Sequence, residues 1–332
     1  MQATLGLVAA ALVAAALPAR ADLTTVKVTI PAIAAYYAPD FIAIDKGYFA
    51  EAGLQIEIVE AGGGVGTPAL ISGTVDFSAS PAAALAAILR GAPLKIIYTM
   101  ADRATYQLWS TEPNVTSLAE MKGKSVGIIS RGDTFEIAMR LTLIQQGFPQ
   151  DWLSYTALGF GAQARDAAMA SGSLPAVIVA ESDLEPLRGT PALARSHLIV
   201  DMYKTLRWPY TGMATSDKLL ATKPDMVERF LGALVKGVRY MKAFKPETLA
   251  ILAKREPQAP AHAIEIDYDA VIPTLTDTGT ASDALIRQDL DVRAGLMNIP
   301  KDKLRPASEI YDYRLLEKAT AALDAAHWQP SR

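Results

Sequence analysis

Residues 39–77 decide the fold, and they read PDFIAIDKGYFAEAGLQIEIVEAGGGVGTPALISGTVDF. Their order predicts a helix, a strand, a glycine-rich turn, a second helix and a short strand. Asp40 is placed to cap the first helix, and Gly53 stands where a helix end favours a positive φ. Residues 55–59 alternate apolar and polar side chains as a strand does. Strands and helices in alternation predict parallel sheets in an α/β protein.

The same stretch resembles the solute-binding proteins of ABC importers in the nitrate, sulfonate and taurine group, the NMT1/THI5-like family. The resemblance rests on GYF at 47–49, Glu51, GL at 53–54 and G-x-x-D at 73–76. It implies a two-lobed periplasmic binding protein fold of type II. Each lobe would be a mostly parallel sheet flanked by helices, with two crossover strands as the hinge. It also implies binding rather than catalysis.

The beginning of the chain predicts export. Residues 5–17 form an apolar run too short to span a bilayer, and Ala19 and Ala21 suit a signal peptidase. We therefore expect a signal peptide at 1–21 and a periplasmic protein, with a buried N-terminal helix as the alternative. Residues 1–6 contain no Lys or Arg, which leaves the start codon open. The chain has no Cys, so a lipid anchor is not expected.

Composition excludes several classes of protein. The net charge is −3 and no basic stripe occurs, which argues against nucleic acid as a partner. Hydrophobic residues make up 51% of the chain, enough for two cores, yet no later stretch is long and apolar enough for insertion in a membrane. No histidines stand at metal-ligand spacing, and no cofactor motif occurs, so neither a metal nor a cofactor is expected.

Strand and helix patterns alternate twice through the first two hundred residues or so. We place the two connections between lobes at 106–110 and 210–215. Domain one would then comprise 22–107 plus 212–332, and domain two 108–211. Residues 226–241 carry apolar side chains at helical spacing, which predicts a core-facing helix in the tail.

Ligands of doubly wound sheets bind beyond the carboxyl ends of the strands, so each strand-to-helix turn is a candidate site. The first turn carries Tyr36 and Tyr37, which offer a stacking face and a hydroxyl, or else cover the surface as half-buried aromatics. The second turn, with Gly64 and Thr67, lets backbone amides approach an anionic oxygen, although a flexible surface turn is equally consistent.

Two further turns carry polar side chains. Ser80 is placed to cap the helix that begins at Pro81, which leaves Ser78 as the expected ligand contact of the two. Arg131 offers a guanidinium fork to a carboxylate or sulfonate, and a solvated arginine is the alternative. Thr134 begins the following helix, for which Asp133 and Glu136 would form an N-terminal cap.

Three more candidates complete the expected cleft. Phe160 lies between two glycines, and Glu181 follows a strand where it could meet an amine. Tyr210, at the second connection, would act as a lid or pack against the hinge.

The leading hypothesis is a periplasmic receptor that closes on a small organic acid or sulfonate. By resemblance, it would deliver its solute to an ABC permease and its ATPase. The resemblance does not fix the oligomeric state, but a monomer suits lobe closure and docking to a permease. The alternatives are an enzyme on the same fold, of the thiamine-precursor or menaquinone-pathway type, and a ligand-sensing partner of a membrane receptor. The enzyme is disfavoured because the chain has no Cys and only three scattered histidines.

Overall fold

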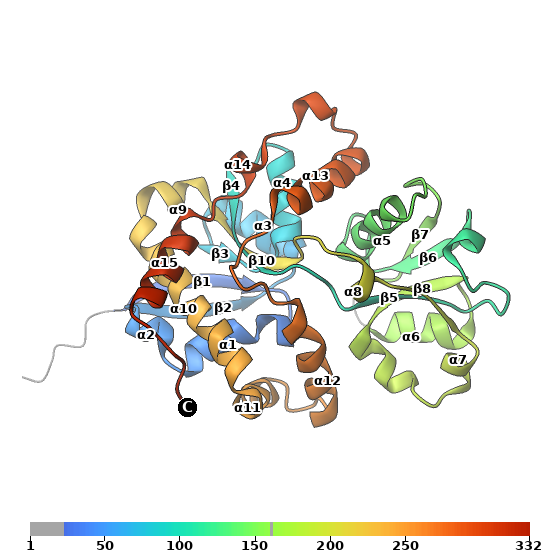
Figure 1. The fold of residues 1–332 in the computed structure, drawn as a ribbon, viewed down its shortest axis with the longest axis horizontal. Helices are drawn as coiled ribbons and strands as arrows, with labels where there is room; N and C mark the ends of the chain where they lie inside the picture. The colour runs from blue at the N-terminus through green and yellow to red at the C-terminus, as the bar shows by residue number, and fades with distance from the viewer. Residues whose placement is uncertain (1–22, 160–161) are drawn as a thin grey trace, which may run out of the picture.

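The structure, a computed structural model, describes residues 23–159 and 162–332. Two lobes lie side by side, each built on one sheet (Figure 1). The expected signal peptide and Phe160 lie outside the described residues. The first and last described residues both belong to the lobe drawn on the left of Figure 1, the first lobe.

The sheet of the first lobe has five strands in the order β2-β1-β3-β10-β4 within the described residues. Its strands are β1 (Thr24–Ile30), β2 (Leu54–Glu60), β3 (Phe77–Ser78), β4 (Leu94–Ala101) and β10 (Thr211–Ser216). β1 pairs in parallel with β2 and β3, whereas β10 runs antiparallel between β3 and β4.

The sheet of the second lobe repeats this plan in the order β7-β6-β8-β5-β9. Its strands are β5 (Tyr106–Ser110), β6 (Ser125–Ile128), β7 (Ser154–Ala157), β8 (Ala176–Ala180) and β9 (His197–Asp201). β6 is parallel to β7 and β8, and β5 is antiparallel to β8 and β9. Two α/β lobes with mixed sheets confirm the expected fold class.

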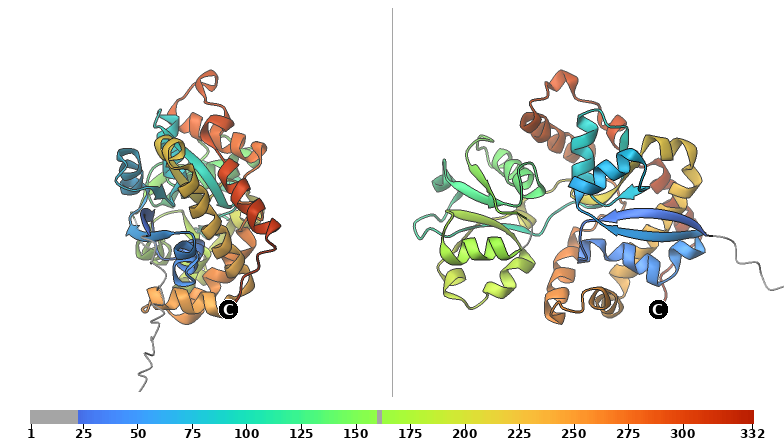
Figure 2. Two further views of the ribbon diagram at one scale, coloured as in Figure 1. Left: turned by 90° about the vertical axis from the view of Figure 1, so that its left-hand side faces the viewer. Right: turned by 180° about the vertical axis from the view of Figure 1, so that it is seen from behind.

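Helices cover both faces of the first sheet (Figure 2). One face is covered by α1 (Ala38–Asp45), α2 (Tyr48–Glu51), α10 (Pro224–Ala243), α11 (Lys245–Arg255), α12 (Ala261–Val271) and α15 (Arg314–Ala325). The other is covered by α3 (Gly63–Ser72), α4 (Pro81–Leu89), α13 (Asp283–Met297) and α14 (Ala307–Ile310). Short elements at its edges are α9 (Asp217–Thr222) and the 3-10 helices η1 (Ala35–Tyr37), η4 (Ile272–Thr274) and η5 (Lys301–Lys303).

The second sheet lies between two smaller sets of helices. The elements of this lobe are η2 (Leu118–Met121), α5 (Thr134–Gln145), α6 (Ala162–Ser171), η3 (Glu181–Leu187), α7 (Pro191–Ala194) and α8 (Met202–Thr205). α5 and α8 contribute to the core on one face, while α6 and η3 contribute to the core on the other. Ser117 and Glu120, which stand at capping-box spacing in the sequence, form a capping box at the start of η2.

The connections between the lobes are shorter than the sequence predicts. Residues 106–110 are β5, fully paired in the second sheet, and β10 is fully paired in the first. The chain crosses instead at 102–105 and 206–210, and these segments are hydrogen-bonded to each other. Trp208 N donates to Asp102 O at 2.9 Å, and Tyr210 N to Ala101 O at 3.0 Å. Strand pairing continues almost to the crossing, so little chain is left unpaired there.

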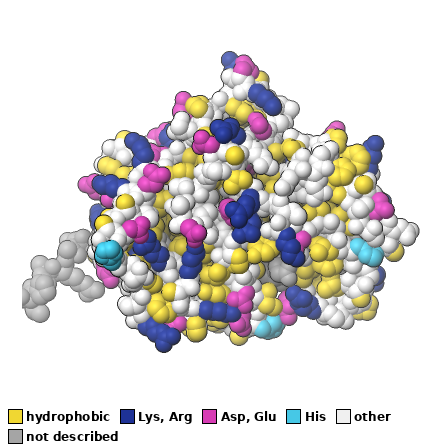
Figure 3. Space-filling view, in the orientation of Figure 1, with side chains coloured by type: hydrophobic (Ala, Val, Ile, Leu, Met, Phe, Trp, Pro, Cys, Tyr) yellow, Lys and Arg dark blue, Asp and Glu magenta, His cyan; other side chains and the backbone are white. Residues whose placement is uncertain are grey.

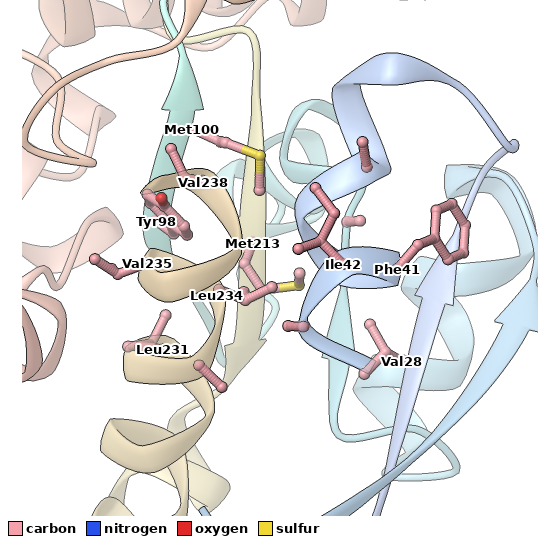
Figure 4. Packing of buried hydrophobic residues seen from close by; sticks show 14 of the residues in the cluster. Val28, Phe41, Ile42, Tyr98, Met100, Met213, Leu231, Leu234, Val235 and Val238 are labelled. Carbon is pink, nitrogen blue, oxygen red and sulfur yellow. The ribbon is translucent and has the colours of Figure 1, made fainter. Parts of the chain in front are cut away.

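The core of the first lobe centres on the crossing of α10 and α1 (Figure 4). Leu231, Leu234 and Val238 of α10 gather there with Ile42 of α1, as the spacing in 226–241 predicts. The two helices approach so closely that a Cβ on Gly237 would lie 2.3 Å from Pro39 O. Only glycine fits this position without moving the backbone of α1.

Asp40 does not cap α1 as expected. It lies inside the first turn, where its side chain is buried, and its Oδ2 has no hydrogen-bond partner among the described residues. The N-cap position belongs to Tyr37, because the helix begins three residues earlier than the pattern indicates. Burial raises the pKa of Asp40 to about 7.

Gly237→Ala should lower the free energy of unfolding by about 1–3 kcal/mol, since the added methyl group meets backbone atoms of Pro39. Gly232→Ala in the same helix is the matched control. Its Cβ would lie 3.7 Å from Ala319 Cβ, an ordinary contact, so it should be neutral or stabilise by up to about 1 kcal/mol. Urea denaturation of both variants measures the difference, and equal effects would contradict the close crossing.

Asp40→Asn should change the free energy of unfolding more favourably at pH 8 than at pH 4. The difference between the two pH values should be about 2–4 kcal/mol. Asp40 binds its proton up to about pH 7 in the folded protein, whereas it ionises near pH 4 in the unfolded chain. The free energy of unfolding of the wild type therefore falls as pH rises between these values. Urea denaturation across this range tests it, with the exposed Asp225→Asn as the control. Parallel pH profiles for the Asp40 variant and the wild type would argue against a buried, protonated carboxyl.

Candidate functional site

A cavity of about 470 Å³ lies between the lobes and is lined by residues of both. The first lobe contributes the starts of α3 and α4, with Gly63, Gly64 and residues 79–83. The second lobe contributes residues 129–134, which lead into α5. Tyr37, Tyr210, Thr211 and Arg293 complete the wall. We call this space the cleft.

On the first-lobe side, two helix starts converge. A Cβ on Gly63 would lie 2.3 Å from Ala83 Cβ, so α3 and α4 touch at their first turns. Neither start has a side-chain cap in the described structure: Gly62 precedes α3, and Ser80 makes no capping hydrogen bond to α4. A Cβ on Gly64 would meet no atom within 4 Å, which leaves backbone open toward the cleft.

On the second-lobe side, the start of α5 is closed by its own carboxylates. Asp133 accepts hydrogen bonds from Glu136 N at 2.9 Å and from Ser130 N at 2.8 Å. Glu136 accepts from Gly132 N at 2.8 Å and from the guanidinium of Arg140. The cap expected from Asp133 and Glu136 is confirmed. Arg131 lines the cleft, but its side chain is 60% exposed and lies 3.5 Å from Glu136.

Three tyrosines gather at the crossing, and of these Tyr210 lines the cleft. Tyr106 OH lies 2.7 Å from Tyr210 OH and 2.9 Å from Thr134 Oγ1, so its hydroxyl joins β5, α5 and the second connection. Tyr36 packs edge-on against Tyr210 at 5.0 Å and donates to Arg103 O. Burial raises the pKa of all three tyrosines, which keeps their hydroxyls neutral and available as hydrogen-bond donors.

A second cavity, of about 360 Å³, lies on the other side of these tyrosines. Tyr36, Glu256 and Asp267 line it from the first lobe, and Arg165 lines it from the second. Arg165 pairs with Asp183 at 2.7 Å, and Asp267 accepts from Ala35 N at 2.8 Å. Burial raises the pKa of Asp267.

Arg293 of α13 was not expected in the site. Its side chain is buried, its Nε donates to both oxygens of Asp289 at 2.9 and 3.0 Å, and its Nη1 donates to Ala82 O at 3.1 Å. Its Nη2 has no partner among the described residues. The sequence does hold a signal: Asp289 and Arg293 stand four residues apart on the face that carries Ile286 and Leu290. A charged pair on an apolar face indicates a buried polar site.

The structure brings most of the predicted residues to the cleft. The cleft is lined by Tyr37, Gly64, Ser80, Arg131, Thr134 and Tyr210. Tyr36 lies behind Tyr210 and lines the second cavity instead. The backbone of Glu181 begins η3, next to the second cavity's Ala180.

Neither Ser78 nor Ser80 has the role that the sequence suggests, since Ser80 makes no capping hydrogen bond to α4 and Ser78 does not line the cleft. β3 extends to Ser78, one residue further than expected, and holds it fully buried between β1 and β10. Ser80 therefore reaches the cleft, and Ser78 does not line it. Thr67 is buried as well and lines neither cavity, because the glycine turn is already the first turn of α3.

The described residues contain no group of three or more His, Asp or Glu side chains arranged to hold a metal ion. Within the same residues, no histidine lines either cavity. No helix described here has the length and apolarity needed to cross a membrane. The arrangement offers hydrogen-bond donors, guanidinium groups and aromatic faces, which are groups suited to binding.

Several solved structures share this fold. The alkanesulfonate-binding protein SsuA of Xanthomonas axonopodis, bound to MOPS, is 17% identical, with 89% of this chain and 100% of that chain covered and a TM-score of 0.67. The periplasmic nitrate-binding protein NrtA of Synechocystis is 17% identical, with 93% and 92% covered and a TM-score of 0.67. The periplasmic aliphatic sulphonate-binding protein of Escherichia coli is 15% identical, with 94% and 93% covered and a TM-score of 0.65.

Sequence comparison agrees with this. The riboflavin-binding protein RibY of Chloroflexus aurantiacus is 25% identical over 234 residues, which cover 67% of this chain and 64% of that protein. Residues 34–248 match the family described as NMT1/THI5 like. The chain therefore belongs to the NMT1/THI5-like family and has the two-lobed fold of its periplasmic solute-binding members.

Proposed function

We propose that this protein captures a small organic solute carrying an acid group and delivers it to an ABC import permease. The observation that carries the proposal is the cleft itself, about 470 Å³ in volume and lined by helix starts of both lobes. Cavities of this size hold small ligands, and an interlobe position lets the solute contact both lobes at once. Export to the periplasm with removal of residues 1–21 belongs to the same proposal.

The chemistry of the wall supports an amphipathic anion. Arg90, Arg131 and Arg293 line the cleft, against a single carboxylate, Asp133, among the described lining residues. Tyr37 and Tyr210 offer flat faces, and Ile129, Ile137, Leu296 and Met297 add apolar surface. Relatives that carry sulfonate, nitrate and riboflavin in their names set the range of solutes to examine.

Capture would depend on hinge closure about residues 102–105 and 206–210. Periplasmic binding proteins as a class close by a hinge around their ligands, and the solute stabilises the closed form because it touches both lobes only there. Acidic and basic side chains are interspersed on the face shown in Figure 3, without a large area of one sign. A mixed surface of this kind suits docking to a protein better than to nucleic acid.

A screen of solutes tests the function. Sulfonates, taurine, nitrate, carboxylates, aromatic acids and riboflavin are added to the purified protein, and the melting temperature is measured. A solute that binds only the folded state should raise it with concentration. Mass spectrometry of the recovered solute separates binding from turnover, and a consumed solute would favour the enzyme.

Trp208 gives a second readout that reports closure. It is buried at the crossing, with its ring 5.5 Å from that of Tyr210. A solute that closes the lobes should change the tryptophan fluorescence, and Trp208→Phe should remove most of that change while the thermal shift remains. Thermal shifts without any fluorescence change would point to a surface site and contradict capture in the cleft.

A further inference from the structure

The two sides of the cleft differ in whether side chains cap the backbone N–H groups at their helix starts. The first four backbone N–H groups of a helix have no partner inside the helix and attract anions. At α5 the carboxylate of Asp133 accepts from Glu136 N in the first turn, and the carboxylate of Glu136 accepts from Gly132 N just before the helix. At α3 and α4 no side chain caps them in the described structure. α4 begins with Pro81, which has no N–H, and the third N–H of each helix bonds to a backbone carbonyl. An anion entering the cleft therefore meets the N–H groups of Gly63, Gly64 and Ala82 on the first-lobe side.

Arg293 adds a buried charge to that side. Its side chain is 3% exposed, Asp289 holds its Nε, and Ala82 O accepts from its Nη1, while its Nη2 has no partner among the described residues. A small recess beside the start of α4, about 10 Å³ in volume, has Arg293, Thr211 and Tyr311 in its lining, together with Asp289, whose carboxylate is paired with Arg293 Nε. Arg293 Nη2, Thr211 Oγ1 and Tyr311 OH are all buried there without a partner among the described residues.

The recess adjoins the cleft. Pro81, Ala82, Thr211 and Arg293 line both spaces. Its volume suits one oxygen atom, and all three unpartnered groups can donate a hydrogen bond. Unpaired buried donors are costly, and an oxygen acceptor placed there would satisfy them.

Arg131 is neither buried nor next to an uncapped helix start. It is the more exposed guanidinium, and the nearest charges to it are carboxylates of its own lobe: Glu136 lies 3.5 Å away, and Asp133 lines the same part of the cleft. An anion at Arg131 would approach both carboxylates, which opposes its binding.

We propose that the acid group of the solute, a carboxylate, sulfonate or phosphate, is bound by the first lobe alone, at Arg293 and the uncapped starts of α3 and α4. This rests on the proposed function and names the part of the cleft that recognises the anion. The second lobe then contacts the remainder of the solute through Thr134 and Ile137.

Gly64→Asp tests this without disturbing the core. A Cβ at this position meets no atom within 4 Å, and an aspartate in the first turn of a helix is favourable, so the variant should fold. Its carboxylate would stand where the anion binds. Calorimetric titration of the full chain with methanesulfonate, benzenesulfonate and inorganic sulfate should show affinity at least about tenfold weaker than in the wild type. Gly64→Asn, of the same size without the charge, should lose less than about threefold.

Two further variants compare the arginines. Arg131→Gln should change sulfonate affinity less than about threefold. Asp289→Asn combined with Arg293→Gln removes the buried pair together, so that no lone charge is left, and should weaken binding at least about tenfold. Circular dichroism and the melting temperature without ligand confirm that each variant is folded.

The outcomes separate this inference from the proposed function. A loss in Arg131→Gln that exceeds the loss in Gly64→Asp would place the acid group on the second lobe. Benzenesulfonamide binding as tightly as benzenesulfonate would show that the charge is not recognised. Either result, or failure of all three anions to bind while another solute closes the lobes, overturns the inference and leaves the receptor intact. If no solute at all closes the lobes, the proposed function fails too.

Discussion

The antiparallel strand inserted into each sheet is the constraint on which the rest of the structure depends. β5 completes the second sheet directly after the first crossing, and β10 completes the first sheet directly after the return crossing. β4 and β10 are hydrogen-bonded neighbours, so the chain leaves and re-enters the first lobe at the same place. The crossings must therefore lie side by side, as the bond from Trp208 N to Asp102 O shows.

This constraint also places the site. Parallel strands of both lobes end toward the crossing, and the helices that follow them start there. The cleft is the space into which these starts point, and Tyr37 and Tyr210 line it near the crossing. Gly212 in β10 shows how tight this arrangement is, since a Cβ there would lie 1.9 Å from Tyr98 O. A side chain at this position would separate β10 from β4.

Features that depend on local chemistry could be predicted from the sequence. The capping box of Ser117 and Glu120, the cap of Asp133 on α5, the positive φ of Gly53 and the start of α4 at Pro81 each involve residues within one turn. Such short-range signals are sufficient to place strand-to-helix turns, and those turns gave most of the residues that line the cleft.

The features that the sequence analysis predicted wrongly or missed depend on strand register or on contacts between residues far apart in the sequence. Whether Ser78 or Ser80 faces the cleft is decided by one residue of strand length, and the pairing with β10 sets that length. Arg293 donates a hydrogen bond to Ala82 O, which lies 211 positions away in the sequence. No local sequence pattern predicts a contact of that kind. Asp40 fits an N-cap by residue type, but burial under α10 and the true start of α1 decide its place.

The helix that carries Arg293 connects recognition with closure. Ile286 and Leu290 of α13 pack in a core of the first lobe, whereas Val292 and Leu296 pack in the core of the second. Arg293 thus lies on a helix whose side chains pack in the cores of both lobes. In the proposed mechanism, closure would change how α13 meets α5, and the proposed anion contact lies on the same helix, so both would depend on the position of α13. A ligand shifts such an equilibrium only by its difference in affinity for the two states. An acid group on the first lobe with the solute body against α5 would produce that difference, because only a closed form would offer both contacts.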